Sequence, residues 1–185
     1  MLSVGLIVEG SYDEAAIPEL IRKSVSSEVN VICRPCGNTN QLMKRFAGFL
    51  NEFQYVNSGK PVGRALVIRD ADQKNPNDLI ARMEEKIRGR IYDFPRRLLI
   101  AVQEMEAWLL ADEEAVSLVT GKRQQRIVNP ETLDDPKARL KKILSDAGIA
   151  YTAEVARKIA ANTRLDVLSV RCASFKKFRE ALTDS

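Results

Sequence analysis

Four nearly continuous apolar runs divide the first hundred residues of the chain into segments of strand length. They are LSVGLIV at 2–8, VNVICR at 29–34, ALVIRD at 65–70 and RRLLIAV at 96–102. Runs of this length without strict alternation are typical of strands that are covered on both faces, as in parallel sheets. We therefore predict four buried strands in this part of the chain.

Helical spacing of apolar residues separates these runs. The first helix is predicted from a capping-box pair, Ser11 and Glu14, and contains Pro18, which either kinks it or marks its first turn. Two more helices are predicted from Gln41 and over 79–87. The order βαβαβαβ predicts an α/β, Rossmann-like fold: a mostly parallel four-stranded sheet flanked by helices, with ligands at the carboxyl ends of the strands.

Beyond residue 115 the pattern becomes helical and basic. A capped amphipathic helix is predicted between Pro136 and Gly148, and the segment SFKKFREAL at 174–182 has the spacing of another. We therefore divide the chain into an α/β core at 1–115 and a basic helical extension at 116–185 that packs on the core.

The composition is that of a compact globular protein. The chain has 185 residues, of which 45% are hydrophobic, enough to bury one sizeable core. No apolar run approaches the roughly 20 residues that span a bilayer, and MLSVGLIVEG lacks the basic segment and cleavage site of a signal peptide. We expect a cytoplasmic protein with no membrane partner. Without a GxxxxGK loop, it is not expected to hydrolyse ATP alone.

Acidic residues are concentrated in three windows of an otherwise basic chain. The net charge is +4, but 1–20, 68–72 and 100–115 together hold eleven acids and one base. This distribution favours a cation site in a surface that attracts polyanions. Carboxylates near helix N-termini also complement the helix dipole, and we prefer that interpretation for four of them: Asp13, Glu14, Glu113 and Glu114.

Five of the acids follow predicted strands. Glu9 comes after the first strand, Asp70 and Asp72 after the third, and Glu104 and Glu106 after the fourth. Because the carboxyl ends of parallel strands meet at one edge of a sheet, all five are expected at the same edge.

Oxygen ligands of this kind suit Mg²⁺ or Mn²⁺, and the chain has no histidine to favour zinc or copper. Asp70 and Asp72 reach one ion only if the chain turns there, and QKNPND supplies a turn. Alone, this pair is more often turn-forming or solvated; the VEG after the first strand strengthens the metal interpretation.

Two motifs resemble a known superfamily. LIVEGSYDE followed by ALVIRDAD is similar to the Toprim domain of topoisomerases, DnaG-type primases, OLD-family nucleases and ribosomal-RNA maturases. VQEMEAWLLAD, DDPKARL and SVRCASFKKFREAL resemble a bacterial Toprim-like family of unassigned function, often encoded beside an AAA-type ATPase, sometimes in defence-like loci. The resemblance covers nearly the whole chain.

The resemblance implies a Mg²⁺- or Mn²⁺-dependent nuclease that acts on DNA or RNA phosphodiesters, with an ATPase partner, in a defence or repair system. Glu9 would be the general acid or base and Gly10 the tight turn beside it. Asp70 and Asp72 would hold the ion. Glu104 and Glu106 are candidates for a second ion, with the alternative that EAWLLAD is only a core helix with Glu106 exposed.

Further residues are candidates for contact with a nucleic-acid backbone. Gly10 is one candidate, and loop amides near Gly37 and Asn40 are others, with the alternative that Gly37 only satisfies a turn. Basic residues of the extension are candidates too, with ordinary solvated surface as the alternative. The five we select are Lys137, Lys141, Lys142, Arg171 and Lys176.

Other functions stay open at this point. The chain would be a regulatory or nucleic-acid-binding subunit without turnover if its carboxylates lay far apart. A small-molecule phosphotransfer enzyme with Asp70 as nucleophile is a third possibility, although Glu9 stands where that chemistry needs a DxD after the first strand. Cys33 and Cys36 form either a redox pair or thiols packed under a loop; they lack the partners of a zinc site.

Overall fold

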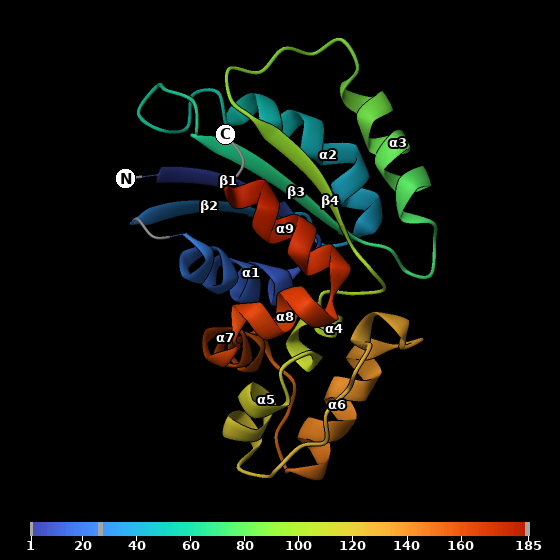
Figure 1. Ribbon diagram of the computed structural model, residues 1–185. Coiled ribbons are helices and arrows are strands. Elements are labelled where there is room, and N and C mark those ends of the chain that lie inside the picture. Colours follow the sequence, from blue (N-terminus) through green and yellow to red (C-terminus); the bar gives the residue numbers. More distant parts are fainter. Residues whose placement is uncertain (1, 26–27, 184–185) are drawn as a thin grey trace.

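A computed structural model of the chain describes residues 2–25 and 28–183. Its centre is a four-stranded parallel sheet in the order β2-β1-β3-β4 (Figure 1). The strands are β1 (Leu2–Val8), β2 (Val29–Pro35), β3 (Arg64–Asp70) and β4 (Arg96–Ala101). The prediction of a Rossmann-like α/β fold is confirmed, and the sheet of the described residues is entirely parallel.

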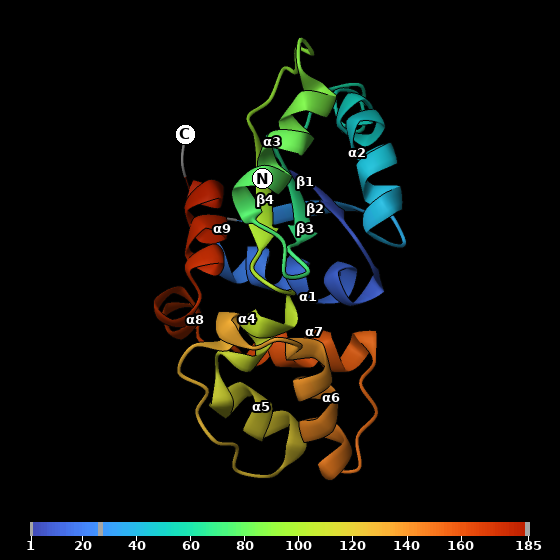
Figure 2. The same ribbon diagram turned by 90° about the vertical axis from the view of Figure 1, so that its right-hand side faces the viewer.

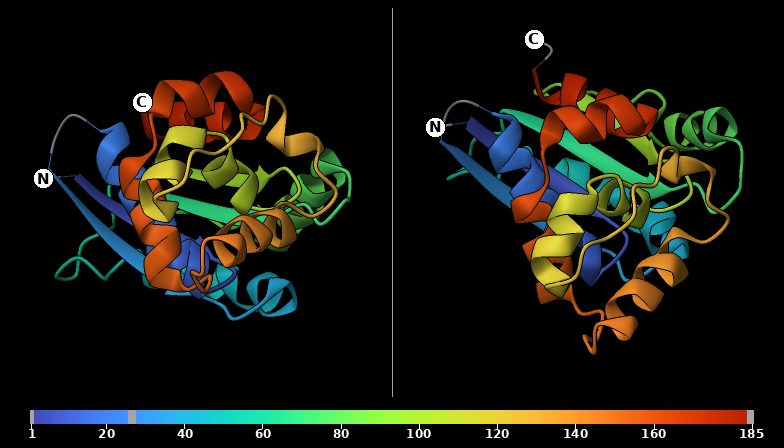
Figure 3. Two further views of the ribbon diagram at one scale, coloured as in Figure 1. Left: turned by 90° about the horizontal axis from the view of Figure 1, so that it is seen from below. Right: turned by 60° about the horizontal axis from the view of Figure 1, so that its bottom comes forward.

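Helices cover both faces of the sheet and its carboxyl end. They are α1 (Ser11–Ser24), α2 (Thr39–Glu52), α3 (Pro76–Ile87), α4 (Glu106–Leu110), α5 (Glu113–Thr120), α6 (Pro136–Asp146), α7 (Ala153–Asn162), α8 (Leu165–Arg171) and α9 (Ala173–Thr183), with a 3₁₀ turn at Pro130–Thr132. In the side view, α9 lies on one side of the sheet and α2 on the other (Figure 2). Viewed from below, α5, α6 and α7 lie in front of the sheet (Figure 3).

The start of α1 differs from the prediction. Its N-cap is Gly10, whose N–H donates to Asp13 Oδ2 at 2.9 Å, so the capping pair is Gly10 and Asp13 instead of Ser11 and Glu14. The chain leaves β1 one residue earlier than the capping-box spacing suggests, which moves the helix start closer to the sheet edge. Pro18 lies buried inside the helix, which continues through it to Ser24.

The start of α2 also lies earlier than predicted. The helix begins at Thr39 because the Asn38 side chain caps it, accepting the Gln41 N–H at 3.0 Å. This places the first turn of α2 directly beside the end of β1, where Gly37 N–H donates to the Glu9 carbonyl. Gly37 has a φ of 101°, a conformation that favours glycine.

Two clusters of buried apolar residues hold the layers together. One packs α2 and α3 against the sheet; the other joins the opposite face of the sheet to α1, α4 and the C-terminal helices. Trp108 of α4 sits among Phe175 and Phe178 of α9, with ring centroids 5.4 and 5.3 Å away. The predicted boundary at residue 115 therefore falls inside α5 and within a continuous core.

No helix among the described residues has the length and apolar character to cross a bilayer. All three cysteines are free thiols; Cys36 and Cys172 are buried and Cys33 is half-buried. Burial raises the pKa of Cys33 to about 12 and that of Cys36 to about 11, so both are protonated near neutral pH. This favours packed thiols over the redox pair.

Candidate active site

The carboxyl ends of β1 and β3 form the point where the strand order reverses. From β1 the chain crosses to β2 on one side, and β3 lies on the other. Such points are the usual ligand sites of open α/β sheets. A cavity of about 340 Å³ lies here, and its wall includes five carboxylates: Glu9, Asp13, Asp70, Asp72 and Glu104. We call these five, together with the adjacent Glu106, the acid cluster.

Glu9 is held between three elements at the end of β1. Its Oε2 accepts a hydrogen bond from Thr39 Oγ1 of α2 at 2.6 Å, and its Oε1 accepts one from the Asp70 N–H of β3 at 3.2 Å. Burial raises the pKa of Glu9, although both hydrogen bonds oppose this shift. The carboxyl group is thus fixed in position and exchanges a proton closer to neutral pH than a free glutamate does.

Asp70 ends β3 and meets the start of α4. Its Oδ1 accepts the Met105 N–H at 3.1 Å. Burial raises its pKa well above the usual range, and the negative charges of Asp13 and Glu9 raise it further. Ionised Asp70 therefore lacks sufficient positive charge around it, which a cation in the cavity would supply.

The turn after β3 occurs at Asp72 itself. Asp72 and Gln73 have φ values of 48° and 63°, in the left-handed region that few side chains adopt. Asp72 N–H donates to the Gln103 carbonyl at 3.1 Å, and this bond holds the turn against the loop after β4. The turn begins one residue before the predicted segment QKNPND and shares Gln73 with it, and it brings both aspartates to the cavity as required.

Asp13 is also a member of the acid cluster, although its sequence position predicts only an interaction with the helix dipole. Burial raises its pKa to about 7; the Gly10 N–H bond opposes this shift, and the charges of Glu106 and Glu9 increase it. Its position in the sequence could have predicted this location. The helix begins two residues after Glu9, so its first turn has to border the same edge of the sheet.

Glu104 and Glu106 occupy different environments. Glu104 lines the cavity, and its Oε2 accepts the Lys137 N–H of α6 at 3.0 Å. Glu106 is buried in α4, with 1% of its surface exposed. EAWLL is a core helix as the alternative proposed, but the expectation that Glu106 would be exposed is wrong, because Tyr151 and Lys137 cover its carboxylate.

The candidates for phosphate contact are dispersed. Gly10, Gly37 and Lys137 line the cavity, whereas Asn40 is exposed on α2 outside its wall. Lys141 is exposed on α6.

Three further candidates are engaged in ion pairs. Lys142 lies 3.5 Å from Asp146, and Lys176 lies 4.0 Å from Glu180. The prediction that Arg171 contacts a nucleic-acid backbone is corrected. Its side chain is only 10% exposed and binds Glu113 and the Ala111 carbonyl, so it joins α8 to α5 instead of facing solvent.

The ligand atoms that the acid cluster offers are of the type that a hard cation prefers. Its oxygens come from carboxylates, no sulfur or imidazole lines the cavity, and the carboxylates raise one another's pKa. In residues 2–25 and 28–183, however, no three Asp, Glu or Cys side chains are arranged to hold a metal. The residues therefore fit such an ion by type and charge, while their side chains are not in ligating positions.

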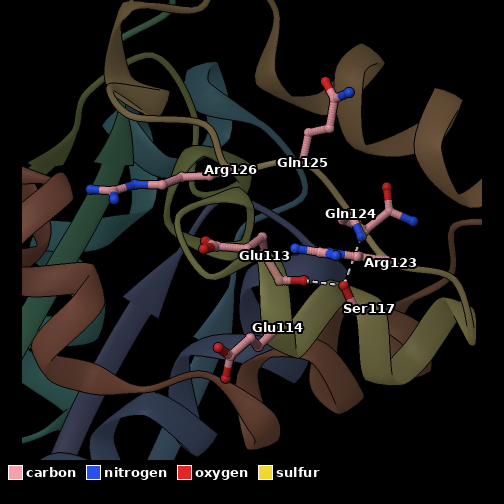
Figure 4. A pocket seen from close by; sticks show the side chains of 7 residues that line it. All are labelled: Glu113, Glu114, Ser117, Arg123, Gln124, Gln125 and Arg126. Atoms are coloured by element: carbon pink, nitrogen blue, oxygen red, sulfur yellow. Dashed lines mark hydrogen bonds between the residues drawn. The ribbon is translucent and has the colours of Figure 1, made fainter.

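A larger hollow of about 600 Å³ lies elsewhere, between α5 and residues 123–126 (Figure 4). Its carboxylates are already neutralised, since Glu113 pairs with Arg171 and Glu114 with Arg164. It lacks the concentration of carboxylates that distinguishes the cavity at the sheet edge. We therefore place the candidate chemistry at the acid cluster.

The sequence matches one known family model over nearly its whole length. The family model described as "Domain of unknown function (DUF4276)" matches residues 8–183, from the end of β1 to the end of α9. The chain belongs to the DUF4276 family. No curated protein and no solved structure matches it.

Proposed function

We propose that this DUF4276 protein is a Toprim-type nuclease that hydrolyses DNA or RNA phosphodiesters with Mg²⁺ or Mn²⁺. The observation that carries the proposal is the acid cluster at the strand-order reversal, where burial and mutual repulsion raise the pKa of Glu9, Asp13 and Asp70. Clustered carboxylates at a sheet edge with too little positive charge are what a divalent cation stabilises.

Each residue has a defined part in this proposal. Asp70 and Asp72 would hold the ion, with Asp13 beside them, and Glu104 and Glu106 would be the carboxylates for a second ion. When bound there, such an ion would supply polarisation of a phosphoryl oxygen and a lower pKa of a coordinated water. Glu9, which Thr39 and Asp70 fix in place, takes or returns the proton as general base or acid.

Binding of the substrate is assigned to other groups. The backbone at Gly10 and Gly37 borders the cavity, and Lys141 is exposed on α6, the helix whose first turn reaches the cavity. Contacts of lysine and arginine with phosphates give affinity without sequence preference. The partner ATPase and the cytoplasmic location belong to the same proposal and rest on the resemblance and the sequence alone.

One observation favours a second candidate function. Because no three side chains of the described residues are arranged for a metal, the protein is alternatively a nucleic-acid-binding or regulatory subunit without turnover. In that case the acid cluster would bind no divalent ion.

The test separates cleavage from binding. Glu9→Gln should lower cleavage by about 10²–10⁴-fold, the usual contribution of a general acid or base, and leave nucleic-acid affinity nearly unchanged. Asp70→Asn should abolish both Mn²⁺ binding in calorimetry and cleavage. The matched control is Glu14→Gln, an exposed glutamate one turn into α1, which should retain full activity.

The substrates are single- and double-stranded DNA and structured RNA, each with Mn²⁺, with and without the proposed partner ATPase. Cleavage that survives Glu9→Gln, or that needs no metal, contradicts the nuclease proposal. Binding without cleavage under every condition selects the regulatory subunit.

A further inference from the structure

One cation already sits against the acid cluster. Lys137 lies in the first turn of α6, and its Nζ is 3.3 Å from Glu106 Oε1. Its backbone N–H donates to Glu104 Oε2 at 3.0 Å. Lys137 thus contacts two carboxylates of the acid cluster, one through its backbone and one through its ammonium group.

The carboxylate that receives this ammonium is deeply buried. Glu106 is 1% exposed, and its Oε1 also accepts a hydrogen bond from Tyr151 OH at 3.1 Å. An ionised carboxylate that has lost its water requires an opposite charge nearby. Among the described residues, Lys137 is the one lysine or arginine that forms an ion pair with Glu106.

An aromatic ring also contacts the ammonium. Tyr12 of α1 stacks on Tyr151, with centroids 4.6 Å apart and an interplanar angle of 14°. Lys137 Nζ lies 4.9 Å from the centroid of the Tyr12 ring, a cation–π geometry. The ammonium is therefore held between a carboxylate and a ring face at the wall of the cavity.

We propose that Lys137 is a built-in counter-ion of the acid cluster, which a divalent cation displaces when it binds. The inference rests on the proposed function, because it concerns the metal that the nuclease would use. The ammonium sits against Glu106 at the wall of the cavity, so it repels a divalent ion that the neighbouring carboxylates attract, and one positive charge does not neutralise six carboxylates. The metal-free protein is stabilised by Lys137, and metal binding requires the ammonium to move away.

The first experiment measures this competition. In calorimetric titration with Mn²⁺ near pH 8, Lys137→Met should bind the ion about tenfold more tightly than the wild type, since a repelling charge is removed. Methionine keeps an apolar side chain over Tyr12. The matched control is Arg139→Met, which removes an exposed charge from the same helix and should leave the affinity within about twofold. Equal or weaker binding by Lys137→Met overturns the proposal.

The second experiment uses the wild-type protein and does not depend on a variant that folds. An amine-acetylating reagent is applied with EDTA or with Mn²⁺, and each lysine is quantified by mass spectrometry. The Lys137 side chain is 33% exposed and should react several-fold faster with Mn²⁺, whereas exposed Lys141 should not change. An unchanged or slower reaction of Lys137 with Mn²⁺ bound overturns the proposal.

The two proposals fail in different ways. If the wild type binds Mn²⁺ and Lys137 neither weakens this binding nor becomes more reactive, the counter-ion role is wrong while the metal site stands. If neither the wild type nor Lys137→Met binds Mn²⁺, both the metal-dependent function and the displacement of Lys137 are wrong.

Discussion

In the first turn of α1, the Asp13 carboxyl group lies close enough to Glu9 and Glu106 to be affected by their charges. Burial raises its pKa from 3.8 to about 7, and the two neighbouring charges contribute to this shift. The folded protein therefore keeps a proton on Asp13 that the unfolded chain releases at much lower pH. Folding stability and protonation are linked at this residue.

We expect Asp13 to make the metal-free protein less stable as the pH rises from about 4 to about 7. The folded-state pKa of Asp13 lies above the unfolded value, so its stabilising effect is complete below about pH 4 and disappears as the pH rises to about 7. Asp13→Asn should flatten this part of the profile and make the protein more stable than the wild type at pH 8 in EDTA. Urea unfolding at a series of pH values measures both effects.

Glu14→Gln is the control for Asp13→Asn. Glu14 lies in the same helical turn but is exposed, so its removal should leave the pH profile unchanged. Asparagine retains an oxygen that can accept the Gly10 N–H, so the cap is preserved. A profile of Asp13→Asn that follows the wild type would mean that Asp13 is an ordinary helix-capping residue.

The sequence identifies the residues at strand ends but not those that packing brings to them. Glu9, Asp70, Asp72 and Glu104 are predictable because each follows a recognisable strand, and parallel strands end at one edge. Asp13 is missed because a carboxylate in a first helical turn has a sufficient local explanation. The buried state of Glu106 depends on Tyr151 and Lys137, which lie 45 and 31 positions away in the sequence.

At the scale of elements, the length of the apolar runs predicts all four strands. The predicted first residues of two helices are wrong. α1 and α2 begin earlier than predicted because their caps, Gly10 and Asn38, are set by the exits from β1 and β2. Those starts matter for function, because they bring Asp13 and Thr39 to the cavity. Cap geometry depends on the path of the loop, which apolar spacing does not report.

Close contact between β1 and the end of α2 explains a glycine inside a strand. A methyl group at Gly5 would overlap the ring of Phe53, the C-terminal cap residue of α2, which is fully buried. Gly5→Ala should therefore lower the free energy of unfolding by about 1–3 kcal/mol through overpacking. Thermal or urea unfolding measures the change.

Gly48→Ala is the opposite control for Gly5→Ala. Gly48 lies on the exposed side of α2, with open space around the position of an added methyl group. Alanine should therefore stabilise the protein by about 0.5–1 kcal/mol through helix propensity. Equal effects of the two substitutions would show that the Phe53 ring moves aside without cost.

At the scale of the whole molecule, the sheet and the C-terminal helices form one structural unit. The sequence predicts a boundary at residue 115, where the pattern becomes basic and helical. The structure shows apolar residues of α6, α7 and α9 in the same buried cluster as β1 and β3. The C-terminal helices thus pack on the sheet, and the boundary at residue 115 stays a prediction, because composition describes the exposed faces and not what the apolar faces pack against.

A shared core has a measurable consequence for unfolding. Trp108 is the single tryptophan of the chain, and it packs against Phe175 and Phe178 at the junction of α4 and α9. Its fluorescence reports the contact between the two parts, whereas far-UV circular dichroism reports all helices and strands. We expect both signals to change in one coincident urea transition, the behaviour of a single cooperative unit.

Phe175→Ala provides the perturbation that completes this test. Truncation of a fully buried phenylalanine typically costs about 3–5 kcal/mol, and Phe175 is 0% exposed. In a shared core the substitution should shift the fluorescence and dichroism transitions together to lower urea. If the fluorescence transition moves alone while a dichroism transition of the sheet persists, residues 1–115 fold independently and the boundary predicted from composition is correct.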